Sequence, residues 1–466
     1  MWRRSHAARS AVACLLLLAA TACGTRLTRQ EILAENAAPG ANATAAGSGT
    51  GMADGGGAIG AASSGDGVEA SGGSTDAGGA NTQGGGAARG KAVGARGAGA
   101  DTGGAKAPIV IGYVGWFGGL AGATSVPSRD AWVAWQKTVN ARGGVNGHRV
   151  DLLIGDTGGS DARGVSIARD FVENKGAIAL SWFSGDATAI AKYAESKSIP
   201  VIGTSVSGVE WNKLPFLFPD APSAGATEWG SARLAKNAGV TRVGTLFCVE
   251  SSACQGGADL FQAEAQAQGL QVVHRGRMSI AQPDYTAECL QMRNAGAQLV
   301  RVFTEGASQV RLAQSCGRQQ YRPIWVPATA DDPMLKIPEL EGALNPLPTF
   351  PWFLRSGAPG VSEYVDALQR YAPDLLTNGA SSQTWGWMAA KTFEQAAEHL
   401  SSRPTSKEIL DGLWAMNGET LSGLAPGGLS RTFTRDRPTP ETYCVFEVRL
   451  GRNSWEAPHG MTPICR

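Results

Sequence analysis

From residue 108 onward, short apolar runs alternate with amphipathic stretches, and this order limits what the chain can fold into. The apolar runs cover residues 108–115, 148–156, 177–183 and 199–205. The stretches between them, residues 128–144, 162–176 and 187–198, place apolar side chains at helical spacing. Strands and helices that alternate in this way form a parallel sheet with helices on both faces.

The same alternation then starts a second time. We predict strands at residues 241–248, 270–276, 297–304 and 321–328, with helices around 255–268, 285–295 and 308–319. Three more helices are predicted around 361–371, 382–400 and 406–416, and two late strands around 430–434 and 442–450. The sequence therefore predicts an α/β protein with two doubly wound lobes.

The first 23 residues have the pattern of an export signal. Arg3, Arg4 and Arg9 precede an apolar run at residues 11–20 that is too short to span a membrane. The segment ends in "AATAC", which resembles the lipobox of bacterial lipoproteins and predicts lipidation of Cys23. The alternative is an ordinary signal peptide with a cysteine by chance.

Residues 24–107 consist mainly of Gly, Ala, Ser, Thr and Asn. Such a segment buries too little apolar surface to offset the entropy of ordering, so we expect a disordered linker. A lipid at Cys23 and a flexible linker behind it predict a domain anchored to the outer side of the cell membrane.

Several functions are excluded by charge and motifs. The net charge of +1, with no basic run after the signal, argues against a nucleic-acid partner. The stretch "GDTGG" at residues 155–159 is similar to a serine-protease loop, but only His6 and His148 precede it, so no catalytic triad forms. A P-loop, a dinucleotide fingerprint, a nucleophile elbow and a metal-ligand cluster are missing too. We therefore expect no enzyme and no cofactor.

Six cysteines follow the signal, and an even number in an exported chain indicates disulfides. Six cysteines allow 15 connectivities, of which pairing between neighbours is the simplest. Zinc binding is the competing hypothesis, but no pair has CxxC spacing. The neighbouring pairs are Cys248 with Cys254, Cys289 with Cys316, and Cys444 with Cys465.

A family resemblance lies in "VNARGGVNGHRVDLLIGDTGGSDARG", residues 139–164. This segment resembles the leucine/isoleucine/valine-type periplasmic binding proteins, the solute-binding subunits of ABC importers. Its glycines and Asn146 tolerate positive φ, so a helix can reverse tightly into a strand. "SIPVIGTS" and "PFLFPDAPS" (residues 198–205 and 215–223) also fit this family.

The resemblance implies two lobes joined by three crossovers, with a ligand cleft between them. It assigns residues 108–220 and 352–416 to lobe 1, and residues 221–351 and 417–466, including all six cysteines, to lobe 2. Open α/β sheets bind ligands at the carboxyl ends of their strands, so the loops at these ends hold the candidate residues.

In lobe 1, two aromatic residues would contact an apolar part of the ligand, although packing between the lobes is the alternative. Hydroxyl groups and backbone N–H groups of two later loops could hold a carboxylate, or they could only cap helices. The candidates are Trp116, Phe117, Ser184, Gly185, Asp186, Thr188, Ser205 and Ser207.

In lobe 2, four acidic residues stand at strand ends: Glu250, Glu305, Asp331 and Asp332, of which the first three are the candidate ligand contacts. Relatives that bind amino acids pair such an acid with the α-ammonium group, and the alternative is a solvated loop charge. The family commonly has Tyr-Gly after the first strand of this lobe, where this sequence has Cys254 and Gln255, so a usual ligand contact is missing.

Taken as a member of this family, the chain is predicted to be a monomeric, lipid-anchored extracytoplasmic protein that binds a small polar solute. An amino acid or a related carboxylate or amide would be captured by hinge closure and delivered to an ABC permease. The alternatives are a ligand sensor that delivers to a membrane receptor and, less favoured, a secreted hydrolase.

Overall fold

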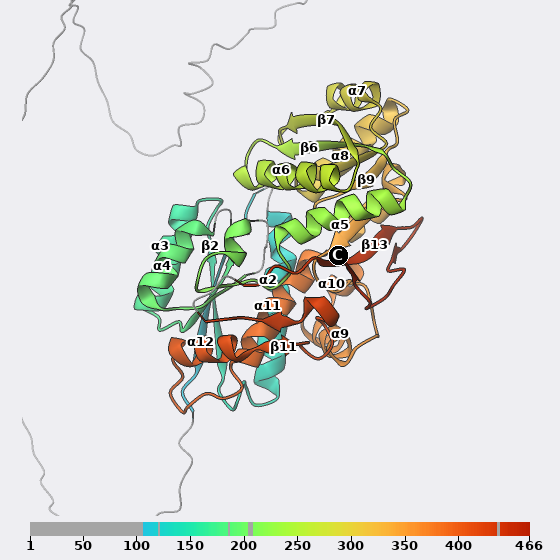
Figure 1. Ribbon diagram of the computed structural model, residues 1–466. Helices are drawn as coiled ribbons and strands as arrows, with labels where there is room; N and C mark the ends of the chain where they lie inside the picture. Colours follow the sequence, from blue (N-terminus) through green and yellow to red (C-terminus); the bar gives the residue numbers. More distant parts are fainter. Residues whose placement is uncertain (1–105, 120–121, 185–186, 204–207, 436–438) are drawn as a thin grey trace, which may run out of the picture. The chain divides into compact units, whose positions relative to one another are not determined.

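The computed structural model describes residues 106–466, except residues 120–121, 185–186, 204–207 and 436–438 (Figure 1). The signal, Cys23 and the linker up to residue 105 lie outside the described residues. So do four of the predicted ligand contacts, Gly185, Asp186, Ser205 and Ser207.

The first sheet is fully parallel, with strand order β2-β1-β3-β4-β5. Its strands are β1 Ile109–Gly115, β2 Val150–Asp156, β3 Ala179–Phe183, β4 Val201–Gly203 and β5 Leu217–Phe218. Alternate side chains of β1 enter different cores, because successive residues of a strand point to opposite faces. Ile111 and Tyr113 pack with α2 (Gly122–Ala141), whereas Val114 packs with α3 (Asp161–Glu173) and α4 (Thr188–Lys197).

The turn between α2 and β2 has the predicted backbone. Gly143, Gly144, Asn146 and Gly147 have φ values of 100°, 88°, 48° and 77°. A Cβ atom on Gly144 would lie 2.0 Å from the carbonyl oxygen of His148, so only glycine fits there. The prediction of a tight helix-to-strand reversal is confirmed.

The second sheet is also fully parallel, with strand order β7-β6-β8-β9. Its strands are β6 Arg242–Cys248, β7 Gln271–Met278, β8 Leu299–Phe303 and β9 Ile324–Val326. The helices α5 Ala224–Asn237 and α6 Ser252–Ala267 cover one face, and α7 Thr286–Ala295 and α8 Gly306–Arg318 cover the other (Figure 1). The predicted fold of two doubly wound α/β units is confirmed.

The carboxyl-terminal helices return to the first sheet. α11 (Ser382–Ala396) packs directly on α2, where a Cβ atom on Gly386 would lie 2.1 Å from the carbonyl oxygen of Ser128. Trp135 of α2 makes an edge contact with Phe393, and its indole N–H donates to Glu394 at 2.8 Å. The core of the first sheet is therefore completed by residues near the end of the chain.

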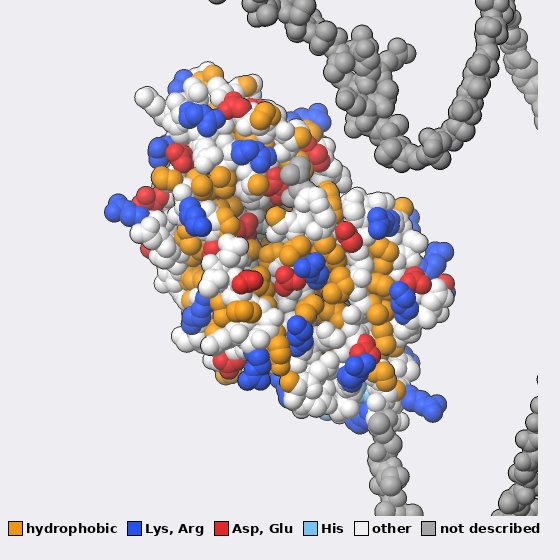
Figure 2. Space-filling view, turned by 180° about the vertical axis from the view of Figure 1, so that it is seen from behind, with side chains coloured by type: hydrophobic (Ala, Val, Ile, Leu, Met, Phe, Trp, Pro, Cys, Tyr) orange, Lys and Arg blue, Asp and Glu red, His pale blue; other side chains and the backbone are white. Residues whose placement is uncertain are grey.

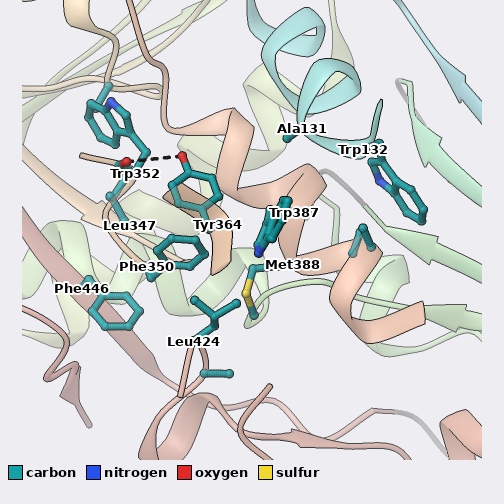
Figure 3. Close-up of a cluster of buried hydrophobic side chains, with 14 of the residues drawn as sticks. Ala131, Trp132, Leu347, Phe350, Trp352, Tyr364, Trp387, Met388, Leu424 and Phe446 are labelled. Atoms are coloured by element: carbon teal, nitrogen blue, oxygen red, sulfur yellow. Dashed lines mark hydrogen bonds between the residues drawn. The ribbon is translucent and has the colours of Figure 1, made fainter. Parts of the chain in front are cut away.

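A group of large buried side chains joins α2 and α11 to the segment that follows β10 (Leu344–Leu347). Trp387, Phe350 and Tyr364 lie side by side in this group, and the Tyr364 hydroxyl donates to the carbonyl of Trp352 at 3.3 Å (Figure 3). The same core extends to Phe446 of β13 (Cys444–Leu450), which pairs antiparallel with β10. The residue boundaries of the two lobes stay a prediction.

The remaining elements are three helices, four short strands and four 3₁₀ turns of the described part of the chain. They are α9 Pro359–Tyr371, α10 Asp374–Thr377, α12 Ser406–Ala415, β11 Asn417–Glu419, β12 Arg431–Thr432, β14 Trp455–Glu456, β15 Ile464–Cys465, and the 3₁₀ turns η1 Val209–Asn212, η2 Asp332–Lys336, η3 Pro338–Leu340 and η4 Gly427–Leu429. None of the helices in the described part of the chain is long and apolar enough to cross a membrane.

Three disulfides join the cysteines as neighbouring pairs: Cys248–Cys254, Cys289–Cys316 and Cys444–Cys465. The first connects the end of β6 to the first turn of α6, the second connects α7 to α8, and the third connects β13 to β15.

Acidic and basic side chains are mixed on the face of the molecule shown in Figure 2, and neither positive nor negative charge forms a large patch there.

Candidate ligand-binding cleft

A cleft of about 320 Å³ opens at the carboxyl ends of both parallel sheets. The lining side chains come from the ends of β1 and β3 in the first sheet and from β6, β8 and β9 in the second. Residues of α2, α5, α6, β10 and α11 complete the wall. Of the predicted ligand contacts, Trp116, Ser184, Glu250 and Glu305 lie in this lining; among the described residues, Phe117, Thr188 and Asp331 do not.

Four aromatic side chains line the cleft: Trp116, Phe183, Phe303 and Trp385. The rings of Phe183 and Trp385 are stacked, with centroids 5.9 Å apart and planes inclined by 22°. The Trp116 indole lies so close to Gly159 that a Cβ atom there would be 3.0 Å from the ring. These flat apolar surfaces can bind the apolar body of a small molecule.

Phe117 turns away from the cleft. Its ring folds back over Gly115, where a Cβ atom would lie 2.6 Å from the ring, and stacks on Tyr113 at 5.5 Å. The guanidinium of Arg129 lies 5.4 Å from the same ring. Phe117 therefore packs within its own lobe, a third outcome beside ligand contact and packing between lobes.

Ser184 lies in the cleft wall, but its hydroxyl already has partners. It donates to the carboxylate of Asp161 at 3.1 Å and lies 3.4 Å from the hydroxyl of Thr157. Thr188 is the first residue of α4, whose N-cap is Ala187 and has no side-chain capping bond.

The side chains of the "GDTGG" loop, residues 155–159, accept hydrogen bonds from backbone N–H groups of the loop and of Phe117. The Asp156 carboxylate accepts from the N–H groups of Gly158 and Phe117, which lower its pKa. The Thr157 hydroxyl is buried and accepts from the N–H of Gly159 at 3.2 Å. The loop therefore ties the ends of β1 and β2 together beside Trp116.

Two of the three acids in the lining, Glu250 and Glu305, accept hydrogen bonds from nearby backbone N–H groups and serine residues. Glu250 accepts from the Ser279 hydroxyl at 2.5 Å and from the N–H of Ile280 at 3.0 Å. Glu305 is the N-cap of α8, is 9% exposed, and accepts from the N–H of Ser308 at 2.9 Å. Glu305 is therefore a buried helix cap, whereas Glu250 is an exposed residue of the loop between β6 and α6, and both lie in the cleft lining.

Asp331 lies outside the lining and is half-buried. Burial raises its pKa to about 7, and the nearby carboxylates of Asp332 and Glu305 add to the effect. The Thr329 hydroxyl donates to it at 3.2 Å, which opposes this shift.

A buried ion pair in the lining was not predicted. Arg301 of β8 binds both carboxylate oxygens of Glu228 on α5, at 2.7 and 2.9 Å. The same guanidinium donates to the carbonyl of Pro327 at 2.7 Å and lies 4.5 Å from the Phe303 ring. The sequence contained one indication of this pair, because Arg301 stands inside the otherwise apolar strand "LVRVF" and needs a buried partner.

Two polar atoms at the cleft have no hydrogen-bond partner among the described residues: the Thr304 hydroxyl and the indole N–H of Trp385. Both residues line the cleft, although the two atoms themselves are buried. No group of three possible metal ligands occurs in the described part of the chain. The site thus combines aromatic walls, three carboxylates and one paired guanidinium.

Two parallel α/β sheets whose strand ends share one cleft, with late helices returning to the first sheet, define a type I periplasmic-binding-protein fold. The family described as "Periplasmic binding protein" matches residues 108–453, and the chain belongs to this family. The resemblance inferred from residues 139–164 is confirmed.

Solved structures share this fold. The leucine binding protein LivK from Thermotoga maritima is 16% identical, with a TM-score of 0.63 over 77% of this chain and 99% of that chain. A branched-chain amino acid ABC transporter protein from Thermus thermophilus with bound valine is 16% identical, with a TM-score of 0.68 over 77% and 97%.

A solute-binding protein of an ABC transporter from R. palustris, in complex with benzoate, is 10% identical, with a TM-score of 0.62 over 77% and 98%. At these identities the likeness concerns the fold alone. No curated protein matches this chain.

Proposed function

We propose that this chain is the extracytoplasmic, lipid-anchored solute-binding protein of an ABC importer. It captures a small solute in the cleft between the two sheets and presents the closed form to a membrane permease. Binding, and not bond-making, is its role. The observation that carries this proposal is the cleft itself, which is lined from the strand ends of both sheets.

The lining favours a solute with an apolar body and a few polar groups. Trp116, Phe183 and Trp385 supply flat surfaces from the first sheet and α11. The carboxylates of Glu250 and Glu305 favour a cationic or hydrogen-donating group at the second sheet. The ligands of two solved relatives, valine and benzoate, each combine an apolar body with one carboxylate. This supports an amino acid, or a related carboxylate or amide, as the solute of this chain.

A binding screen tests the proposal. We expect at least one compound from a panel of leucine, valine, phenylalanine, benzoate, their amides and simple sugars to raise the melting temperature. A ligand at 100 times its Kd stabilises the folded state by about 2.7 kcal/mol. The same compound should change the tryptophan fluorescence, because two tryptophans line the cleft. Hydrolysis of ester or peptide substrates, with no compound bound, would contradict the proposal.

A further inference from the structure

One of the three disulfides is part of the cleft wall. Cys248 is the last residue of β6, Cys254 lies six positions later in the first turn of α6, and both are among the lining residues. Cys248 is buried and Cys254 is half-buried. The disulfide thus closes a short ring of residues at the cleft surface.

The ring also carries cleft contacts of its own. Glu250, Ser251 and Ala253 lie between the two cysteines, and all three line the cleft. At one end, the N–H of Val249 donates to the carbonyl of Met278 at 3.0 Å. The disulfide therefore fixes the spacing between three lining residues and the strand that supports them.

The start of α6 also packs against β8. A Cβ atom on Gly257 would lie 2.5 Å from the Phe303 ring, so this turn rests directly on an aromatic wall of the cleft. The disulfide adds a direct link between the end of β6 and the first turn of α6. Between its two ends, Glu250 accepts hydrogen bonds from Ser279 and Ile280.

The disulfide Cys289–Cys316 has a different setting. Both cysteines are 0% exposed, they connect α7 and α8 within the core of the second sheet, and neither lines the cleft. This pair offers a matched control, because its removal affects the core of the same lobe and leaves the cleft wall in place.

We propose that the Cys248–Cys254 disulfide is a positioning element of the ligand site, which holds the ring of residues 248–254 in the conformation that binds solute. The inference rests on the proposed function. Opening the disulfide lowers solute affinity while the lobe stays folded. By linkage, a bound solute protects this disulfide from reduction by the same factor by which reduction weakens binding.

The reduction step needs a named dithiol, for which dithiothreitol serves. One of its thiolates attacks a sulfur of the disulfide to give a mixed disulfide, and its second thiolate then closes to the cyclic oxidised form. Cys248 and Cys254 leave as two thiols, so two electrons and two protons pass from dithiothreitol to the protein.

The test compares Cys248→Ser/Cys254→Ser with Cys289→Ser/Cys316→Ser. Titration with benzoate and with valine, followed by tryptophan fluorescence, should show binding to the first variant at least about tenfold weaker, since several residues must be ordered on binding. The core variant should bind as wild type does and melt at a lower temperature. Equal affinity of wild type and the first variant would overturn the proposal.

A second measurement needs no solute. Amide hydrogen exchange at residues 249–253 and at Ile280 should be at least about fivefold faster in Cys248→Ser/Cys254→Ser than in wild type, with the rest of the lobe unchanged. Unchanged exchange overturns the positioning role whatever binds. If no compound binds wild type although the exchange result is as expected, it is the proposed function that fails.

Discussion

Arg301 and Glu228 form a two-point ion pair in the cleft wall, and their side chains are only 4% and 5% exposed. The guanidinium has further partners in the carbonyls of Val326 and Pro327, so its charge is well compensated. Because α5 and β8 each supply one partner, the pair fixes the helix to the central part of the second sheet. Substitution of Glu228 tests how much this ion pair contributes to the stability of the protein.

We predict that Glu228→Gln destabilises the protein by about 3–5 kcal/mol, because it leaves a buried guanidinium without its counter-charge. Urea denaturation measures the change. The exposed pair of Arg149 and Asp151 is the control, where Asp151→Asn should change stability by less than about 1 kcal/mol. Equal effects of the two substitutions would contradict the assignment.

Trp116→Ala and Trp385→Ala should each weaken solute binding about 10- to 100-fold, because each removes an aromatic wall of the cleft. Calorimetry with the strongest compound of the panel measures the loss. Trp414 is a suitable control, since it packs against Phe216 and Phe218 and is not a lining residue. Trp414→Ala should lower the melting temperature and leave the affinity unchanged.

Glu305 caps α8 and, in our proposal, also contacts the solute, and substitution can separate these two roles. Glu305→Ala removes the cap of α8 and should cost about 1 kcal/mol of stability, in addition to any loss of affinity. Thr405→Ala, which removes the cap of α12, a helix with no residue in the cleft lining, should cost a similar amount and bind solute as wild type does. A Glu305→Ala protein as stable as wild type would show that the cap contributes nothing.

The stability of the protein should depend on pH through Asp331. Its pKa is about 7 in the folded state, above the ordinary 3.8, so between these values the folded state holds a proton that the unfolded state has lost. The stability therefore falls as the pH rises through this window. Asp331→Asn should stabilise the protein at about pH 8, on the order of 1–3 kcal/mol, with a smaller difference at about pH 4.

Asp284 provides the opposite case. Hydrogen bonds from Thr286, Arg318 and Ser315 lower its pKa, so its contribution to stability is present at neutral pH and is lost as the pH falls. Thermal melts of Asp331→Asn and Asp284→Asn across pH should therefore shift in opposite directions at neutral pH. A common direction would refute the assignment for Asp331.

Cys23→Ala tests the lipid anchor predicted from "AATAC". The substituted protein should move from the membrane fraction to the soluble extracytoplasmic fraction, because the acylated residue is gone. Fractionation with an antibody against the folded part measures this. A variant that stays in the membrane fraction as wild type does would place the anchor elsewhere.

The order of strands and helices was predictable because apolar periodicity is local in the sequence. The strands from β1 to β4 and β6, β8 and β9 fall within the predicted runs, and β7 extends two residues beyond its run. α5 was missed because its segment, rich in Ala and Gly, shows no clear apolar face, and ten of its fourteen residues are buried. β10, β14 and β15 were missed because short antiparallel strands depend on partners far along the chain.

The candidate site was predictable only where a strand end determines it. Trp116, Ser184, Glu250 and Glu305 follow strands and reach the cleft, whereas the direction of Phe117 depends on the space left by Gly115. Trp385 comes from α11, more than two hundred residues after β1, and no local pattern connects the two.

The return of α11 to α2 also sets the order in which the chain can fold. Trp135 needs Phe393 and Glu394 as partners, so the first sheet cannot close its core while only the early residues have been synthesised. Until about residue 396 has left the ribosome, α2 keeps an apolar face without a partner. A core that is complete only with residues near position 396 delays folding until most of the chain has been made, which would suit a chain that is exported before it folds.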